Sequence, residues 1–141
     1  MKTAVAAAIC AAALLSSCRA REGDAPGDGI RWMDSIPAAL KEAARRRGPV
    51  MAVLYSDRSS WCRRLDAETF ADPEVRSLAR RFVAARVDVD GDRETRSAYA
   101  PSALPTVLFM DAEGKVVRRA VGFKPAPGFL AEMRAALDQA R

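Results

Sequence analysis

Blocks of apolar residues separated by turn-forming residues predict an α/β domain over most of the chain. The continuous apolar run at 50–55 is bounded by turn signals, as expected for a strand that is buried on both faces. Alternating apolar positions predict a second strand at 82–89, and two further apolar runs predict strands at 106–110 and 115–121. Helical spacing predicts helices that begin near Asp34 or Ser35, cover 63–70, begin near Asp72, cover 92–99 and begin at Pro127.

The order of these elements limits how the strands can pair. Helices separate the first two strands, and we expect these strands to be parallel because a parallel pair needs a crossover connection. The last two strands are joined by the short turn at 111–114, which is typical of an antiparallel hairpin. The sequence therefore predicts one mixed central sheet of about four strands, flanked by helices.

The first thirty residues follow a different pattern. Lys2 precedes an apolar run at 4–15, which is typical of a secretory signal and too short for a comfortable membrane span. The run ends in Leu15-Ser16-Ser17-Cys18, which resembles the lipobox of bacterial lipoproteins. The resemblance implies that 1–17 is a signal peptide and that Cys18 carries lipid. The rest of 18–30 is rich in glycine and charge and is interpreted as a flexible tether to a domain at 31–141.

This interpretation predicts an exported protein, anchored by the lipid on Cys18 to a bacterial membrane and facing the periplasm or the outside. The residue after the lipidated cysteine is Arg19, and the absence of aspartate there favours the outer membrane. The formal charge of +5 is too small to indicate nucleic-acid binding, which export also disfavours. We therefore expect an envelope protein or peptide as the partner and no nucleic acid.

Composition removes several classes of active site. The chain has no histidine and three cysteines, at 10, 18 and 62, which excludes histidine-ligated metals, Cys-His pairs and multi-bridge disulfide scaffolds. Asp88, Asp90 and Asp92 alternate, but the pattern of a calcium-binding loop is not completed, so a strand-end turn and helix cap is the better interpretation. No phosphate loop or dinucleotide motif is present, and we expect neither a metal nor a cofactor.

Four groups of residues, in their order and spacing, resemble the thioredoxin-like superfamily over about 31–140. They are Trp61-Cys62 with the segment to Phe70, Asp72 to Val75 with the strand ending at 90, Tyr99 with Leu104-Pro105-Thr106, and 111–114 with Val121-Gly122-Phe123. The chain is similar to exported members akin to the C-terminal domain of thiol:disulfide interchange proteins. The resemblance implies a thioredoxin-like fold in which Pro105 is a cis proline facing the active-site loop. It also implies that Trp61, Leu104 and Pro105 bind substrate.

The active-site motif of this family, Cys-x-x-Cys, is incomplete here. If Cys62 were the first cysteine, Leu65 would replace the second; if Cys62 is the second, Ser59 replaces the first. Relatives place a phenylalanine eight residues after the second cysteine, and Phe70 stands eight residues after Cys62, which favours a Ser-x-x-Cys motif. Trp61 argues the other way, because in thioredoxin a tryptophan directly precedes the first cysteine.

A single thiol leaves three functional hypotheses open. Cys62, the candidate catalytic thiol, would form a mixed disulfide with a thiol protein, aided by the positive charges of Arg58, Arg63 and Arg64. Alternatively, the domain is a non-catalytic module that binds a peptide or partner protein in the groove beside Pro105. The third hypothesis is a structural or assembly role in the envelope. Whether the protein is an enzyme is undecided at this point, because function belongs to the site and not to the fold.

Overall fold

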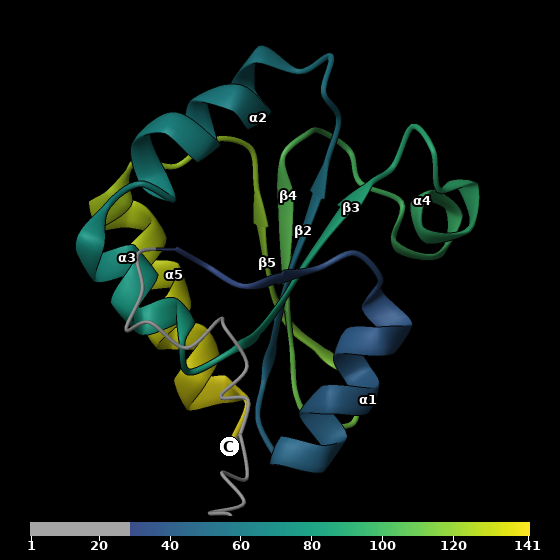
Figure 1. Ribbon diagram of the computed structural model, residues 1–141, viewed down its shortest axis with the longest axis vertical. Coiled ribbons are helices and arrows are strands. Elements are labelled where there is room, and N and C mark those ends of the chain that lie inside the picture. Colours follow the sequence, from purple (N-terminus) through teal and green to yellow (C-terminus); the bar gives the residue numbers. More distant parts are fainter. Residues whose placement is uncertain (1–28) are drawn as a thin grey trace, which may run out of the picture.

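The computed structural model describes residues 29–141, which form a five-stranded sheet with helices on both faces (Figure 1). The predictions for the signal peptide, Cys18 and the tether to residue 28 lie outside the described residues. The strands are β1 (Trp32–Met33), β2 (Val50–Tyr55), β3 (Val83–Asp88), β4 (Thr106–Met110) and β5 (Val116–Val121). The helices are α1 (Ile36–Arg46), α2 (Ser60–Arg64), the π-helical turn η1 (Leu65–Thr69), α3 (Pro73–Ala79), α4 (Arg93–Tyr99) and α5 (Ala126–Gln139).

The sheet is mixed, as the sequence predicts, with the order β1-β3-β2-β4-β5. Strand β2 pairs in parallel with β3 and antiparallel with β4, and β4 and β5 form the expected hairpin. The sheet has one strand more than the four that the sequence indicates. Strand β1 contributes only two residues, which pair with β3 through Trp32 and Ala84, and so short a strand leaves no periodic signal in the sequence.

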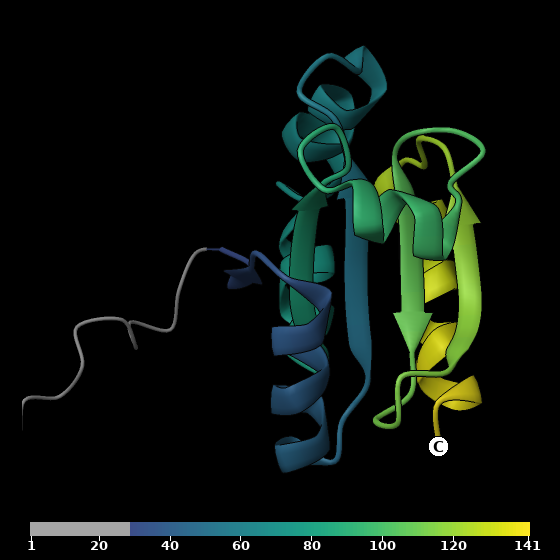
Figure 2. The ribbon, with the colours of Figure 1, turned by 90° about the vertical axis from the view of Figure 1, so that its right-hand side faces the viewer.

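Helices cover both faces of the sheet, as two views at right angles show (Figures 1 and 2). Helices α3 and α5 cover one face, where Met51, Phe109, Phe129 and Met133 are buried. Helix α1 covers the other face, where Ile36, Leu54, Leu108 and Met110 are buried. Because β2 and β4 are buried on both faces, they appear in the sequence as continuous apolar runs.

The helices begin at residues whose side chains accept hydrogen bonds from unpaired backbone N–H groups. Ser35 accepts from the N–H of Ala38 at 3.2 Å at the start of α1. Asp72 accepts from the N–H groups of Glu74 and Val75 before α3, and Asp92 accepts from that of Thr95 before α4. The aspartates at 72 and 92 are therefore helix caps, consistent with the interpretation of the 88–92 segment as a turn and cap.

The helix expected at 63–70 differs from the observed one in its start and in its form. Helix α2 begins at Ser60 and changes at Leu65 into the π-helical turn η1. In this turn the N–H of Phe70 donates to the carbonyl of Leu65, five residues earlier, at 2.9 Å. The wider turn leaves Leu65, Thr69 and Phe70 all buried, a combination that a sequence pattern of period 3.6 does not predict.

Candidate functional site

The sulfur-bearing residue lies at the end of the molecule where β2 runs into α2. Cys62 occupies the first turn of α2 and is 3% exposed, and it is the only cysteine among residues 29–141. Its backbone N–H donates to the hydroxyl of Ser59 at 3.3 Å, which makes Ser59 the N-cap of α2. Residue 59 therefore stands at the helix start, and Cys62 lies one turn into the helix.

The loop before β4 faces this helix start. The peptide bond between Leu104 and Pro105 is cis. The hydroxyl of Ser59 lies 3.5 Å from the carbonyl oxygen of Leu104, at the limit of a hydrogen bond. Thr106 is fully buried and donates to the carbonyl of Ala103 at 2.6 Å, which holds the loop in place. Three of the residues singled out in the sequence, Ser59, Leu104 and Pro105, are therefore neighbours.

Two hydrogen bonds connect the loop between β5 and α5 to other segments of the site. The N–H of Gly122 donates to the carbonyl of Pro105 at 2.7 Å, with Gly122 at a φ of 83°, a conformation that favours glycine. The hydroxyl of Thr69 in η1 donates to the carbonyl of Lys124 at 2.6 Å. The loop between β5 and α5 is thus tied on one side to the cis-proline loop and on the other to η1.

An exposed aromatic and cationic surface stands beside the buried thiol. The indole of Trp61 is 52% exposed and stacks against Phe123, with 6.0 Å between ring centroids and 30° between ring planes. The guanidinium of Arg64 lies 4.4 Å from the centroid of Phe123 and 5.7 Å from that of Trp61, within cation–π range. We refer to Trp61, Arg64 and Phe123 as the aromatic platform. Its side chains are held together and yet leave the indole open to a partner.

The loop between β2 and α2 is fixed from the neighbouring strand. The hydroxyl of Ser56, which is 4% exposed, donates to the carboxylate of Asp90 and accepts from the N–H of Arg58 at 3.1 Å. Asp88 accepts from the N–H of Asp90 at 2.9 Å. The alternating aspartates thus support the loop that leads to Cys62. Residues 29–141 contain no group of three or more side chains suited to holding a metal ion.

Strand β2 carries no carboxylate beneath Cys62 that could accept the proton of its thiol. The residue six before Ser59 is Val53, which is 2% exposed and pairs in register with Arg86 of β3. The guanidinium of Arg86 donates to both carboxylate oxygens of Asp66, at 2.7 and 2.6 Å. It also lies 4.1 Å from the ring centroid of Tyr55. Burial opposes the charged form of Arg86, but the hydrogen bonds and charge of Asp66 outweigh it and raise the pKa of this guanidinium.

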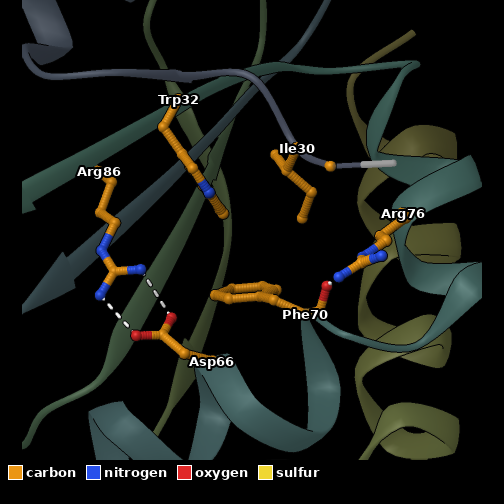
Figure 3. Close-up of a pocket in the computed structure, with 7 residues that line it drawn as sticks. Ile30, Trp32, Asp66, Phe70, Arg76 and Arg86 are labelled. Atoms are coloured by element: carbon orange, nitrogen blue, oxygen red, sulfur yellow. Dashed lines mark hydrogen bonds and ion pairs between the residues drawn. The ribbon is translucent and has the colours of Figure 1, made fainter. Parts of the chain in front are cut away.

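The same ion pair forms one wall of a hollow of about 340 Å³ (Figure 3). Trp32 and Phe70 meet edge to face in it, with centroids 5.1 Å apart, and Arg76 donates to the carbonyl of Phe70 at 3.0 Å on the far side. Gly29 and Ile30, the first described residues, also line it. Because the arginines at 76 and 86 are already hydrogen-bonded to the protein, we assign no ligand to this hollow.

The structure thus brings together most of the residues that the sequence marks. Ser59, Trp61, Cys62, Leu104 and Pro105 lie around one helix start, whereas Cys18 lies outside the described residues. Sequence reasoning missed Phe123 as the stacking partner of Trp61, Thr69 as the link to the β5–α5 loop, and the pair formed by Asp66 and Arg86. Two of these three contacts join residues more than 50 apart in the chain, and no local pattern encodes such a distance.

Comparison with known proteins places this arrangement in context. The sequence profile of the thioredoxin-like domain family matches residues 36–137. The thiol:disulfide interchange protein DsbD of Ralstonia nicotianae is 32% identical over 117 residues, which cover 79% of this chain and 19% of that protein. The chain therefore spans about a fifth of the length of this curated relative.

Solved structures have the same fold. A thioredoxin from Thermus thermophilus superposes with a TM-score of 0.73 at 28% identity, covering 80% of this chain and 91% of that one. The C-terminal domain of DsbD from Neisseria meningitidis, in its oxidised form, superposes with a TM-score of 0.64 at 20% identity, covering 75% of this chain and 99% of that one.

Proposed function

The chain belongs to the thioredoxin-like domain family, and on this premise we propose that it is a single-thiol member which forms a mixed disulfide with a partner protein through Cys62. The observation that carries the proposal is the placement of Cys62, which lies one turn inside a helix capped by Ser59 and directed at the cis-proline loop. In the proposed register Ser59 occupies the position of the missing first cysteine.

The chemistry open to one thiol is an exchange in two steps. Deprotonated Cys62 attacks a disulfide of the partner, the partner's S–S bond breaks, and a bond between Cys62 and one partner sulfur forms. The departing partner sulfur takes up a proton from water. A thiol of the partner or of another protein then attacks the mixed disulfide and releases Cys62 as a thiol. Because Ser59 cannot form a disulfide, the resolving thiol has to come from outside this domain.

The burial of Cys62 limits how fast its sulfur can attack a partner disulfide. Cys62 is 3% exposed, so attack requires the first turn of α2 to move away from the cis-proline loop. The hydroxyl of Ser59 holds that turn by accepting from the N–H of Cys62, with only a marginal contact to Leu104 on the other side. We infer that a bound partner opens the turn and that the free domain reacts slowly.

The aromatic platform supports a second candidate function, binding without turnover. Trp61 is exposed, stacked and flanked by the guanidinium of Arg64, while the thiol next to it is covered. A rigid aromatic surface of this kind is typical of binding hot spots. In this alternative the platform, Leu104 and Pro105 hold a peptide or partner protein, and Cys62 serves only as a small buried residue.

We further propose that the protein works in the cell envelope as a lipoprotein. The support is the lipobox-like sequence ending at Cys18, and the same proposal divides the chain into 1–17, 18–30 and 31–141. Among residues 29–141 no helix has the length and apolar character needed to cross a membrane. Mass spectrometry of the mature protein tests the proposal: acyl groups on an amino-terminal Cys18 are expected, and an unmodified Cys18 contradicts it.

One experiment separates the two candidate functions. Cells that produce the full chain are acid-quenched and alkylated, and extracts are compared on non-reducing and reducing gels. We expect adducts that a reductant releases and that Cys62→Ser abolishes, while Cys18→Ala retains them. The labelling rate of Cys62 in the purified protein is measured alongside, with and without a small disulfide.

Adducts that depend on Cys62 support the mixed disulfide. Slow labelling of Cys62 with no adduct in cells removes the redox function. Partner capture that is unchanged by Cys62→Ser but lost in Trp61→Ala then establishes the binding module. Lys41→Ala is the control, because Lys41 is an exposed residue of α1, which covers the sheet away from the aromatic platform.

A further inference from the structure

Two clusters of arginines meet at one end of the fold. Arg45, Arg46 and Arg47 end α1, and Arg80 and Arg81 lie between α3 and β3; all five are exposed. The two segments lead into neighbouring strands, because Val50 pairs with Val83 and the N–H of Val83 donates to the carbonyl of Pro49 at 2.8 Å. Residues more than 30 apart in the sequence thus form one surface, which we call the basic end.

The basic end lies opposite the thiol. Strands β2 and β3 are parallel, so both start at the basic end and both finish at the end that carries Ser59 and Cys62. Figure 1 shows this directly, with α1 ending at the bottom of the view and α2 beginning at the top. A surface in contact with the basic end would leave the cis-proline loop and the aromatic platform open to a partner.

Two arginines of the basic end share one carboxylate, and two others form no ion pair within residues 29–141. Glu42 accepts from Arg45 at 2.6 Å and from Arg46 at 2.5 Å, and these hydrogen bonds lower the pKa of Glu42 to about 2. One carboxylate therefore stays ionised but serves two guanidiniums. Arg47 and Arg81 take part in no ion pair with any residue from 29 to 141. Other acidic residues also lie at this end. Asp111 and Glu113 stand in the turn after β4, which lies against Leu40 of α1 and is followed by Lys115, and Asp138 near the end of α5 pairs with Arg141 at 3.4 Å.

We propose that the basic end binds anionic phospholipid headgroups and orients the domain on its membrane with the thiol face outward. Guanidiniums recognise phosphate through paired hydrogen bonds as well as through charge. Arginines near an anionic bilayer are attracted by its negative surface potential, within about a Debye length of the surface.

The length of the tether is compatible with this orientation but does not impose it. Cys18 and Gly29 are eleven residues apart, a separation that spans at most about 40 Å when extended. A domain of this size has a radius of gyration of about 13 Å, so a lipid on Cys18 leaves either end able to face the bilayer. The charge distribution then decides which end does so. This inference uses the proposed anchor for orientation only, and the test below does not depend on it.

The test measures binding of residues 18–141, the mature chain under the proposed processing, to vesicles. Every sample carries Cys18→Ala, so that neither the apolar run at 4–15 nor an acyl chain contributes. Vesicles of phosphatidylglycerol and phosphatidylcholine in equal parts are compared with pure phosphatidylcholine, at 50 and 300 mM salt, by co-sedimentation. The test variant is Arg47→Glu with Arg81→Glu, and Arg47→Lys with Arg81→Lys retains the charge. The matched control is Arg58→Glu with Arg93→Glu, the same charge change at the thiol end.

We expect salt-sensitive binding that requires phosphatidylglycerol. The test variant should bind at least roughly thirtyfold more weakly, because loss of the two arginines alone is the equivalent of about 1 kcal/mol each and the two glutamates add repulsion. The lysine variant and the control should bind within about threefold of the parent. Equal binding to the two kinds of vesicle would overturn the proposal, as would an equal loss of binding in the Arg58→Glu, Arg93→Glu control. Stronger binding of the parent to immobilised polyglutamate than to the vesicles would also overturn it, because it would indicate an acidic protein as the partner. Circular dichroism establishes that each variant is folded.

Discussion

The hydroxyl oxygen of Ser59 accepts a hydrogen bond from the backbone N–H of Cys62 at 3.3 Å. An oxygen at this position keeps the helix capped, which a thiol does poorly, but it cannot bond covalently to the sulfur one turn later. In the proposed register, Ser59 therefore keeps the helix start capped but removes the second thiol of a dithiol loop.

Replacing Ser59 by cysteine should restore an internal disulfide with Cys62. The change is made in a chain carrying Cys10→Ala and Cys18→Ala, and a loss of two mass units on mild oxidation, reversed by a reductant, is measured by mass spectrometry. Leu65→Cys is the matched control, since position 65 is the other candidate for a partner cysteine. A disulfide in the Leu65→Cys chain but not in the Ser59→Cys chain would show that the register proposed here is wrong.

Removing the N-cap of α2 should lower the free energy of unfolding while leaving Cys62 in place. Ser59→Ala loses the acceptor for the N–H of Cys62, and loss of an N-cap typically costs about 1 kcal/mol of unfolding free energy. Ser59→Asn should recover most of that loss. Urea unfolding measures all three proteins, with Ser60→Ala as the control, because Ser60 is exposed and caps nothing. Equal losses at positions 59 and 60 would contradict the capping role.

The ion pair between Asp66 and Arg86 should contribute more to the free energy of unfolding than the exposed pair between Arg64 and Glu68. Asp66→Asn leaves a partly buried guanidinium with a poorer partner, and we expect a loss of about 1–2 kcal/mol in unfolding free energy. Glu68→Gln removes the exposed pair with Arg64, which is expected to cost at most about 0.5 kcal/mol. Paired urea denaturation curves measure both, and a larger loss for Glu68→Gln would refute this ranking.

The lowered pKa of Glu42 predicts how its ion pairs respond to low pH. Hydrogen bonds from Arg45 and Arg46 lower the pKa of Glu42 from 4.5 to about 2 in the folded state. A depressed carboxyl pKa contributes stability that is complete above 4.5 and is lost as the pH falls towards 2. Carbon-detected NMR titration should therefore place the midpoint of Glu42 near 2, and Arg45→Ala with Arg46→Ala should move it upwards. The same titration midpoint for Glu42 in the parent and in the double alanine variant would contradict these contacts.

Local sequence patterns accounted for much of the fold, because the elements are short and their signals are strong. The apolar runs at 50–55 and 106–110 became the two strands that are buried on both faces. Asp72 and Asp92 cap the helices expected after them. The fifth strand and the π-helical turn were missed, since one is two residues long and the other depends on a hydrogen bond between Phe70 and Leu65 within a crowded core.

The sequence by itself determined the chemical inventory: no histidine, and one cysteine after residue 18. Only the tertiary structure decided what surrounds that sulfur and which charges share a surface. Trp61 meets Phe123, and Arg47 and Arg81 come to the same end, because strand pairing and helix packing unite segments distant in the chain. Side-chain type is local information, whereas burial and neighbourhood follow from how the whole chain closes on its core.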